Sequence, residues 1–306
     1  KYGLDTVLLT QAQIREKLPL IADNAKVRGA MFTASDGRAE PSRATRAMFE
    51  AAIEAGVSVI LGARVTRVDI QAGYVHGVWI GRRLYRADQV LCAAGTESSK
   101  LLRAVGYILP QERIRATVAR TVPAADLTVN PCISLPLTGI RQDARGAFVF
   151  SGGGGEYDVR LDSWRTMRHY QETRKSNPDA ARINYLGPLQ KLAPLRPSAP
   201  IADIAPTSEA VEPAYYRVQQ AQDEIRRFLP AIADLEIEAV WAGIIDTLPD
   251  VIPVMGHVNG VDGLLVATGF SGHGFGLGPM AGKVMAEFAQ GHSSSVDISG
   301  LSPDRF

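Results

Sequence analysis

The stretch ATGFSGHGFGLGPMAG, residues 267–282, carries six glycines in sixteen residues. It follows the apolar run GLLV and leads into a segment with helical spacing. Glycine has no Cβ, so another group can approach such a main chain closely. A loop that ends at a helix N-terminus also presents free N–H groups with partial positive charge. The placement favours an elongated ligand with an anionic or electron-accepting edge over the alternative, in which the glycines serve only tight turns.

Two common nucleotide motifs do not fit this stretch. A P-loop needs Gly-x-x-x-x-Gly-Lys-Ser/Thr, but Gly282-Lys283 is followed by Val284, and Leu277 stands where the first glycine belongs. The dinucleotide fingerprint Gly-x-Gly-x-x-Gly fails because glycine alternates strictly with other residues over 272–276. An NAD-dependent dehydrogenase is therefore disfavoured.

The composition is that of an ordinary globular protein. Among 306 residues, 46% are apolar and 21% charged, and the formal net charge is +1 without a clustered Lys/Arg stripe, which disfavours a nucleic-acid partner. Cys92 and Cys132 lie far apart and fit no metal-binding spacing. No apolar run approaches the roughly 20 residues that cross a bilayer. We expect a cytoplasmic protein without a transmembrane segment or metal, with peripheral association with the inner membrane as the alternative location.

Helical and strand patterns alternate in the first third of the chain. Thr10 and Gln13 have the spacing of a capping box, which opens a short helix. Residues 41–56 begin with a proline and repeat small residues at helical spacing, which predicts a helix packed closely on a sheet. Residues 57–92 predict a three-stranded meander leading into an apolar strand.

The pattern changes between residues 112 and 255. Apolar runs there predict antiparallel strands, residues 162–175 and 212–229 predict amphipathic helices, and the proline-rich stretch 192–206 predicts an irregular connection. A buried strand and a final helix opening near Pro279 follow. This order predicts an α/β fold of nucleotide-binding type, interrupted by an α+β insertion.

Four stretches resemble, in order and spacing, the FAD-dependent D-amino-acid oxidase superfamily, which includes glycine and sarcosine oxidases and D-amino-acid dehydrogenases. They are DGRAEPSRATRAMFEAAIEAGVSVILGARVTRV, ADQVLCAAGTESSKLL, WAGIIDTLPDVIPVMG and LLVATGFSGHGFGLGPMAGKVMAE. The resemblance implies an FAD-binding domain of that type over 41–111 and 256–306. It also implies a substrate domain with an antiparallel sheet over 1–40 and 112–255.

The resemblance also implies which residues hold the cofactor. The Val65 backbone would face the adenine, and Ala93, Ala94 and Gly95 would pass close to the ADP part. The residues that would run along the ribityl chain and the flavin pyrimidine edge are Gly272, His273, Gly274, Phe275, Gly276 and Leu277. Sarcosine oxidases tether their flavin through a cysteine at the position matching Gly243, so non-covalent FAD is expected here.

Four residues are candidates for a catalytic or substrate-binding role. His273 lies in the loop expected at the flavin, with packing or backbone support as the alternative. Tyr157 and Arg160 are candidates for the substrate carboxylate, because Arg binds carboxylates through two hydrogen bonds; a surface turn is the alternative. Asp246, with Thr247, could line the substrate side of the flavin or cap local backbone.

The resemblance implies oxidation of an amino acid or secondary amine, by hydride transfer from the α-carbon to FAD, giving an imine. The alternative is a non-catalytic or assembly subunit of a flavoprotein complex. The N-terminal Rossmann strand with Gly-x-Gly-x-x-Gly, which the family carries, is absent from the sequence. We therefore expect an incomplete FAD-binding domain, completed by a companion chain or a cleaved segment.

Overall fold

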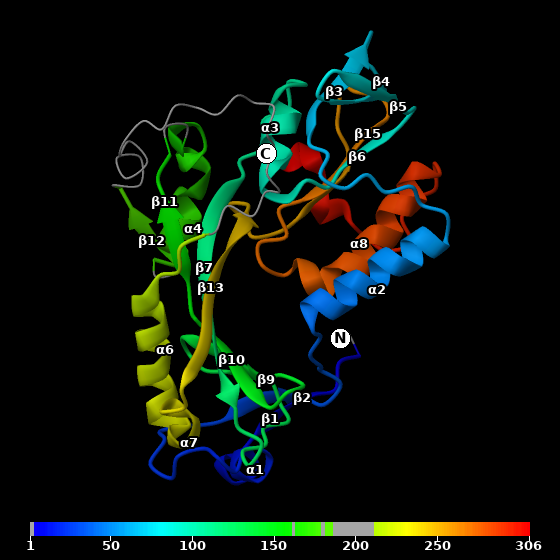
Figure 1. Cartoon of the computed structure of the whole chain (residues 1–306). Helices are drawn as coiled ribbons and strands as arrows, with labels where there is room; N and C mark the ends of the chain where they lie inside the picture. The colour runs from blue at the N-terminus through cyan, green and yellow to red at the C-terminus, as the bar shows by residue number, and fades with distance from the viewer. Residues whose placement is uncertain (1–2, 161–162, 179–180, 186–210) are drawn as a thin grey trace. The chain divides into compact units, whose positions relative to one another are not determined.

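The structure is a computed structural model that describes residues 3–160, 163–178, 181–185 and 211–306 (Figure 1). Its contacts divide the chain into two compact units. Unit 1 consists of Lys1–Val57, Ala116–Gly155 and Ala210–Gly243, and unit 2 of Ser58–Arg115, Glu156–Glu209 and Ile244–Phe306. The predicted boundaries of an FAD-binding and a substrate domain stay a prediction.

The largest sheet lies in the middle of the chain and has seven strands among the described residues. Antiparallel strands were expected in this part of the chain, and antiparallel pairs are present. The strand order is β12-β11-β7-β10-β9-β8, and β13 also pairs with β7. The strands are β7 (Glu112–Pro123), β8 (Ile133–Ser134), β9 (Thr138–Gln142), β10 (Ala147–Gly152), β11 (Gly155–Asp158), β12 (Ala181–Asn184) and β13 (Ile237–Thr247).

The core of unit 1 lies between this sheet and two helices, α6 (Tyr215–Phe228) and α7 (Pro230–Ala233). Phe148 and Phe150 of β10 pack with Val218 and Ile225 of α6, and Figure 1 shows α6 running along the sheet. All four side chains are buried. The predicted amphipathic helix at 212–229 is therefore confirmed, and its apolar face is what the sheet covers.

The N-terminal part of unit 1 begins with the predicted capping box. The Thr10 hydroxyl accepts a hydrogen bond from the Gln13 backbone, and the Gln13 side chain accepts one from the Thr10 backbone. Helix α1 (Gln11–Lys17) is therefore capped at its N-terminus by this reciprocal pair. Strand β2 (Ala30–Thr33) pairs antiparallel with β1 (Thr6–Leu9).

Helix α2 (Pro41–Glu54) forms where it was predicted, and its expected close packing on a sheet stays a prediction. None of its residues is buried, and Met48, Phe49 and Ile53 are among the exposed apolar side chains.

Unit 2 contains the predicted three-stranded meander. Strands β3 (Val65–Gln71), β4 (Tyr74–Ile80) and β5 (Arg83–Arg86) form an antiparallel sheet in the order β3-β4-β5. The first strand was predicted to begin near residue 57, but residues 57–64 form no strand. These β-branched and apolar residues have no described strand to pair with, and Ile60 and Leu61 are exposed.

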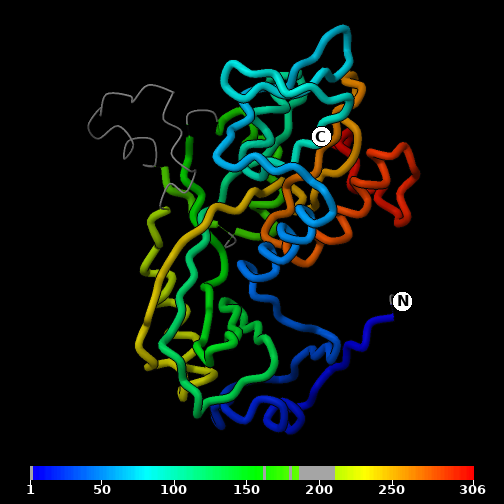
Figure 2. The backbone as a smooth tube through the Cα atoms, turned by 45° about the vertical axis from the view of Figure 1, so that its right-hand side comes forward, coloured from blue at the N-terminus to red at the C-terminus, as the bar shows by residue number. Residues whose placement is uncertain are grey.

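A second sheet in unit 2 has the order β14-β15-β6. Strand β15 (Leu264–Thr268) pairs antiparallel with β14 (Val254–His257) and parallel with β6 (Val90–Cys92). One face packs against helix α8 (Gly274–Ala289) through Leu265, Val284 and Met285. Figure 2 shows β14, β15 and α8 as one continuous orange-to-red group. The predicted buried strand and final helix are both present.

The remaining elements are short. Segment η1 (Gly95–Glu97) and helix α3 (Ser98–Arg103) follow β6, and η4 (Ser299–Leu301) and η5 (Pro303–Arg305) close the chain. The helix predicted at 162–175 is broken into η2 (Ser163–Arg165), η3 (Met167–Tyr170) and α4 (Gln171–Ser176). The proline-rich stretch 192–206 lies outside the described residues. In the described part of the chain, no helix combines the length and apolarity needed to cross a membrane.

Candidate functional site

The glycine-rich loop leaves strand β15 in a left-handed conformation. Gly269, Ser271 and Gly272 have φ angles of 75°, 51° and 86°, which glycine adopts freely. Only Ser271 lacks that freedom, and its hydroxyl bonds locally to the Gly269 carbonyl at 3.0 Å. A Cβ on Gly269 would approach Leu248 Cδ1 to 2.2 Å, so the first glycine is required for close packing as well as for its φ.

Helix α8 begins at Gly274, earlier than predicted. The predicted start near Pro279 was wrong, because Pro279 lies inside the helix as its sixth residue. Gly274, Gly276 and Gly278 all occupy helical positions, where each glycine costs about 1 kcal/mol relative to alanine. The second half of the glycine-rich stretch is therefore the first turn of a helix.

This first turn offers unbonded N–H groups. Leu277 N donates to the His273 carbonyl at 3.3 Å, but no acceptor within the described residues is recorded for the N–H groups of Gly274, Phe275 and Gly276. The His273 side chain does not cap them. Unbonded donors at a helix N-terminus suit an acceptor that carries or develops negative charge.

The same turn is open on its outer side. A Cβ on Gly276 or Gly278 would meet no atom within 4 Å. Phe275 and Leu277 are 43% and 45% exposed. Bare main chain, free donors and flanking apolar side chains fit a flat ring with a polar edge. The residues present therefore fit a flavin.

The second predicted cofactor stretch, Ala93 to Gly95, follows strand β6. Gly95 has a φ of 52°, and a Cβ on it would meet nothing within 4 Å. Ala93 and Ala94 are exposed, whereas Cys92 before them is buried, and burial raises the pKa of its thiol. Because β6 and β15 run parallel with Cys92 beside Val266, both glycine stretches leave the sheet at the carboxyl ends of their strands. Ligands of open α/β sheets bind at this edge.

A buried polar network joins the two stretches. The Gln111 side-chain N–H₂ group lies 3.0 Å from the Gly95 carbonyl, 3.1 Å from Thr268 Oγ1 and 3.2 Å from Asp246 Oδ2. Asp246 Oδ2 also accepts from the Gly269 N–H at 2.7 Å. Asp246 was predicted as a catalytic or a capping residue, and in the structure it accepts hydrogen bonds from the start of the glycine-rich loop.

Gln111 and Thr268 were not among the predicted site residues. Both are almost fully buried, at 3% and 1% exposure. The only signal for Thr268 is a polar residue at the end of an apolar strand, directly before a glycine. Gln111 lies in LPQERIR, which resembles a solvent-exposed polar turn in sequence.

Tyr157 and Arg160 lie together in unit 2, around a carboxylate that was also not predicted. Arg160 Nη2 donates to Glu112 Oε2 at 3.1 Å, and the Thr166 hydroxyl donates to Glu112 Oε1. Glu112 is 3% exposed, whereas the Arg160 side chain keeps 30% exposure. The Arg160 guanidinium is thus partly accessible and oriented by a buried carboxylate.

The Tyr157 hydroxyl is buried beside the side chains of Ser163 and Glu112, without a well-formed hydrogen bond to either. Burial raises the pKa of Tyr157 to about 12, so this phenol is a neutral donor near neutral pH. The nearby Tyr170 hydroxyl lies 2.9 and 2.5 Å from the carbonyl oxygens of Pro110 and Thr247, which share its single hydrogen. Burial raises the pKa of Tyr170 as well.

The roles predicted for Val65 and Gly243 stay predictions. Val65 begins β3 opposite Ile80, half-buried. Gly243 lies in β13, exposed, and a Cβ there would meet nothing within 4 Å. No cysteine stands at this position.

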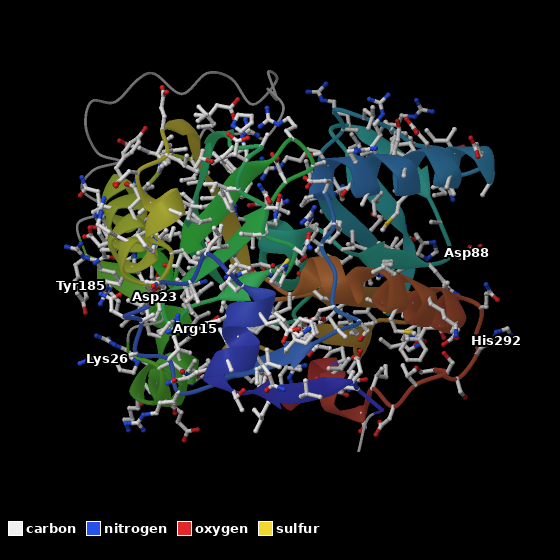
Figure 3. The ribbon with its side chains drawn as sticks, turned by 90° about the horizontal axis from the view of Figure 1, so that it is seen from below. Arg15, Asp23, Lys26, Asp88, Tyr185 and His292 are labelled. Atoms are coloured by element: carbon white, nitrogen blue, oxygen red, sulfur yellow. The ribbon has the colours of Figure 1, made fainter. Side chains whose placement is uncertain are left out.

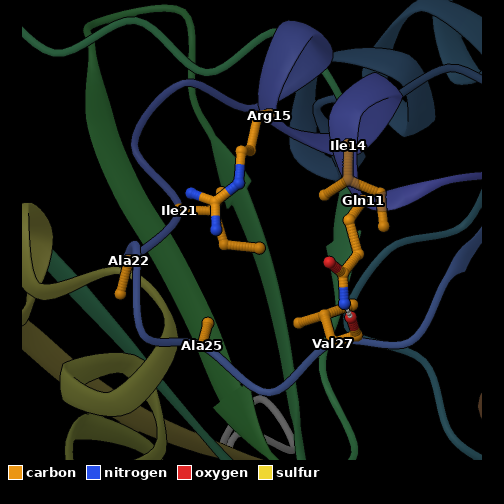
Figure 4. Close-up of a pocket in the computed structure, with 7 residues that line it drawn as sticks. All are labelled: Gln11, Ile14, Arg15, Ile21, Ala22, Ala25 and Val27. Carbon is orange, nitrogen blue, oxygen red and sulfur yellow. Dashed lines mark hydrogen bonds between the residues drawn. The ribbon is translucent and has the colours of Figure 1, made fainter.

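Two hollows in unit 1 do not contain predicted site residues. The first has a volume of about 10 Å³, room for one water, and its lining residues, shown in Figure 4, are Gln11, Ile14, Arg15, Ile21, Ala22, Ala25 and Val27. The Gln11 amide donates across it to the Val27 carbonyl at 2.7 Å. Arg15 pairs instead with Asp23, labelled beside it in Figure 3. The second is a wide, open hollow of about 530 Å³ along the first two turns of α2.

The comparison with protein families identifies the family of this chain. The model of the FAD dependent oxidoreductases (DAO) matches residues 1–288. The chain belongs to this family. Enzymes of the DAO family use FAD, so the resemblance noted in the sequence and the predicted cofactor are confirmed.

Relatives and solved structures agree with this assignment. D-amino acid dehydrogenase of Rhizobium rhizogenes is 20% identical over 288 residues, covering 92% of this chain and 56% of the relative. Glycine oxidase of Pseudomonas aeruginosa is 26% identical over 229 residues, covering 75% and 49%. L-amino acid deaminase from Proteus vulgaris has the same fold, with a TM-score of 0.84 at 18% identity, over 100% of this chain and 71% of that one. The chain spans about half the length of the curated relatives it matches.

Proposed function

We propose that this chain provides the flavin-edge and substrate side of an oxidoreductase that oxidises the C–N bond of an amino acid or a secondary amine. The observation that carries the proposal is the open first turn of α8, with unbonded N–H groups at Gly274, Phe275 and Gly276. Relatives named as D-amino acid dehydrogenase and glycine oxidase support the substrate class.

Each of the predicted cofactor residues has a role in this proposal. The N–H groups of 274–276 bind the pyrimidine edge of FAD, and the positive end of α8 stabilises negative charge there. Gly272, His273 and Leu277 flank that edge. Ala93, Ala94 and Gly95 lie along the ADP part, and the Val65 backbone faces the adenine. FAD is held without a covalent bond and supplies the hydride acceptor for the substrate α-carbon.

The substrate carboxylate binds to Arg160 and Tyr157. The Arg160 guanidinium is oriented by Glu112, and the buried Tyr157 hydroxyl is a neutral donor close to the same carboxylate. Together they hold the substrate so that its α-carbon hydrogen faces the flavin. Asp246 positions the loop backbone, because its carboxylate accepts a hydrogen bond from the Gly269 N–H. His273 supports the same loop and transfers no proton.

A companion polypeptide or a cleaved segment completes the FAD-binding sheet in this proposal. Strand β6 pairs only with β15 among the described strands, so its other edge keeps unpaired backbone groups. Leu91, in the middle of β6, is 45% exposed. The Gly-x-Gly-x-x-Gly strand that binds the pyrophosphate would pair with this edge.

The test uses the protein purified from its native host, together with any polypeptide that copurifies. We expect a yellow protein that releases FAD on denaturation. It should reduce an artificial dye with at least one compound among D- and L-amino acids, sarcosine and proline. A stably folded, colourless protein would instead support an assembly subunit. A yellow protein inactive with every amine would refute the proposed substrate class and leave the flavin site in place.

A further inference from the structure

We propose that Gln111 is a positioning residue that holds the glycine stretches 93–95 and 269–276 in the arrangement that binds flavin. This inference rests on the proposed function. Gln111 does not touch the unbonded N–H groups of α8 itself; it acts through Gly95, Asp246 and Thr268.

The Gln111 side-chain amide lies between four groups from separate parts of unit 2. Its oxygen accepts from the Ser99 N–H at 3.1 Å, in the first turn of α3. Its nitrogen faces three acceptors, the Gly95 carbonyl, Thr268 Oγ1 and Asp246 Oδ2, within 3.0 to 3.2 Å. One side chain therefore contacts the ends of β13 and β15, the start of η1 after β6, and the start of α3. At 3% exposure, water cannot readily replace it.

The contacts of its partners extend the connection into the glycine-rich loop. Asp246 accepts from the Gly269 N–H at 2.7 Å with its side chain and from the Ser271 N–H at 3.0 Å with its backbone. The Thr268 hydroxyl lies 3.2 Å from both the Gly95 carbonyl and Asp246 Oδ2. A shift of the Gln111 amide would thus be transmitted to both stretches that the proposal places against FAD.

The chemistry of this position requires a neutral donor. The acceptors at Gly95 and Asp246 need hydrogens, and a carboxylate at position 111 would face the Asp246 carboxylate at a distance of about 3 Å. Like charges this close favour protonation of one partner, which raises the pKa of the pair. A protonated glutamic acid keeps the shape of glutamine and restores one donor.

The test compares Gln111→Glu with the wild-type protein. FAD is removed from each, and its dissociation constant is measured by flavin fluorescence across neutral to mildly acidic pH, together with the visible circular dichroism of the bound flavin. At neutral pH we expect the variant to bind FAD at least about tenfold more weakly, equivalent to about 1.4 kcal/mol. The ratio of the two constants should return toward one as pH falls, because the introduced acid becomes protonated below its raised pKa.

Gln142→Glu is the matched control. Gln142 is also buried, at 8% exposure; its amide donates to the Leu127 and Gly146 carbonyls and accepts from the Val129 N–H, all within unit 1. This variant should lose stability without changing FAD affinity or its pH dependence. If Gln111→Glu does not fold at neutral pH, Gln111→Met replaces it. That variant should bind FAD more weakly at every pH.

Three results would decide against the inference. They are an unchanged FAD affinity and circular dichroism in the Gln111 variants, an affinity loss in Gln111→Glu that acid does not reverse, and an equal loss in Gln142→Glu. A wild-type protein that neither carries nor binds FAD would instead refute the proposed function, which distinguishes the two failures.

Discussion

At the scale of single residues, Asp246 shows how a candidate catalytic group can serve the backbone. Its Oδ2 atom lies within 3.2 Å of three donors, from Gly269, Thr268 and Gln111. A carboxylate engaged in this way fixes the start of the glycine-rich loop. The sequence offered both roles for Asp246, and only the structure brings its three partners together.

Replacing Asp246 by alanine should therefore affect stability before chemistry. The change leaves the buried Gly269 N–H without its acceptor, so we expect the free energy of unfolding to fall by about 1–3 kcal/mol. Chemical denaturation of the flavin-free proteins measures this loss. Wild-type stability combined with a large loss of activity would contradict the capping role and support a catalytic one.

Tyr157 gives a prediction about pH. Burial raises its pKa to about 12, above the ordinary tyrosine pKa of about 10. Because the folded state binds this proton more tightly, the contribution to stability is fully present below pH 10. It is lost as pH rises from about 10 to about 12. Other buried tyrosines add to the same trend, so the comparison is with Tyr157→Phe.

The difference in unfolding free energy between wild type and Tyr157→Phe should change across that alkaline range and stay constant below it. Tyrosinate absorbance of the folded proteins checks the titration directly. A phenol that ionises near pH 10 in the folded wild-type protein would show that the hydroxyl is not buried as described.

Burial explains which residues sequence reasoning could not find. Gln111 and Glu112 are consecutive polar residues in a segment that looks solvent-exposed, yet both are 3% exposed. Their partners are far away in sequence: Asp246 is 135 residues from Gln111, and Thr166 is 54 residues from Glu112. Local pattern carries no information about such contacts. Arg160 and Tyr157, by contrast, are close in sequence and could be proposed together.

At the scale of elements, helix α8 begins earlier than its sequence pattern predicts. Glycines at 274, 276 and 278 disfavour a helix locally, so propensity places its start at Pro279. The structure begins the helix five residues earlier. Tertiary packing of Ala281, Val284 and Met285 against β14 and β15 compensates for the weak first turn. A strong helix former at 276 would raise stability, and the proposed function accounts for the glycine there by the close approach of the flavin.

Gly276→Val and Gly282→Val form a matched pair that tests this explanation. Both positions are in α8, and a Cβ at either would meet no atom within 4 Å. Helix propensity predicts nearly equal, small changes in stability, within about 0.5 kcal/mol. We expect Gly276→Val to lose flavin during purification and Gly282→Val to retain it. Normal flavin content in Gly276→Val, measured by absorbance per protein, would mean that no ring lies against this turn.

At the scale of the whole molecule, the sequence was informative about architecture and family. The α/β fold, the meander of β3 to β5, the β15–α8 unit and helix α6 were expected and are present. The missed features depend on tertiary context: the unpaired run 57–64 and the broken helix near residue 170. The run 57–64 is rich in apolar and β-branched residues, which a local pattern assigns to a strand, but no described strand pairs with it.

Hydrogen exchange at the start of α8 tests the central claim most directly. In the flavin-free protein, the N–H groups of Gly274, Phe275 and Gly276 have no recorded acceptor among the described residues, so they should exchange rapidly. Adding FAD should slow exchange in the peptide that spans 272–278, while a peptide from α6 stays unchanged. Equal exchange at 272–278 with and without bound FAD would contradict the claim that this backbone holds the flavin.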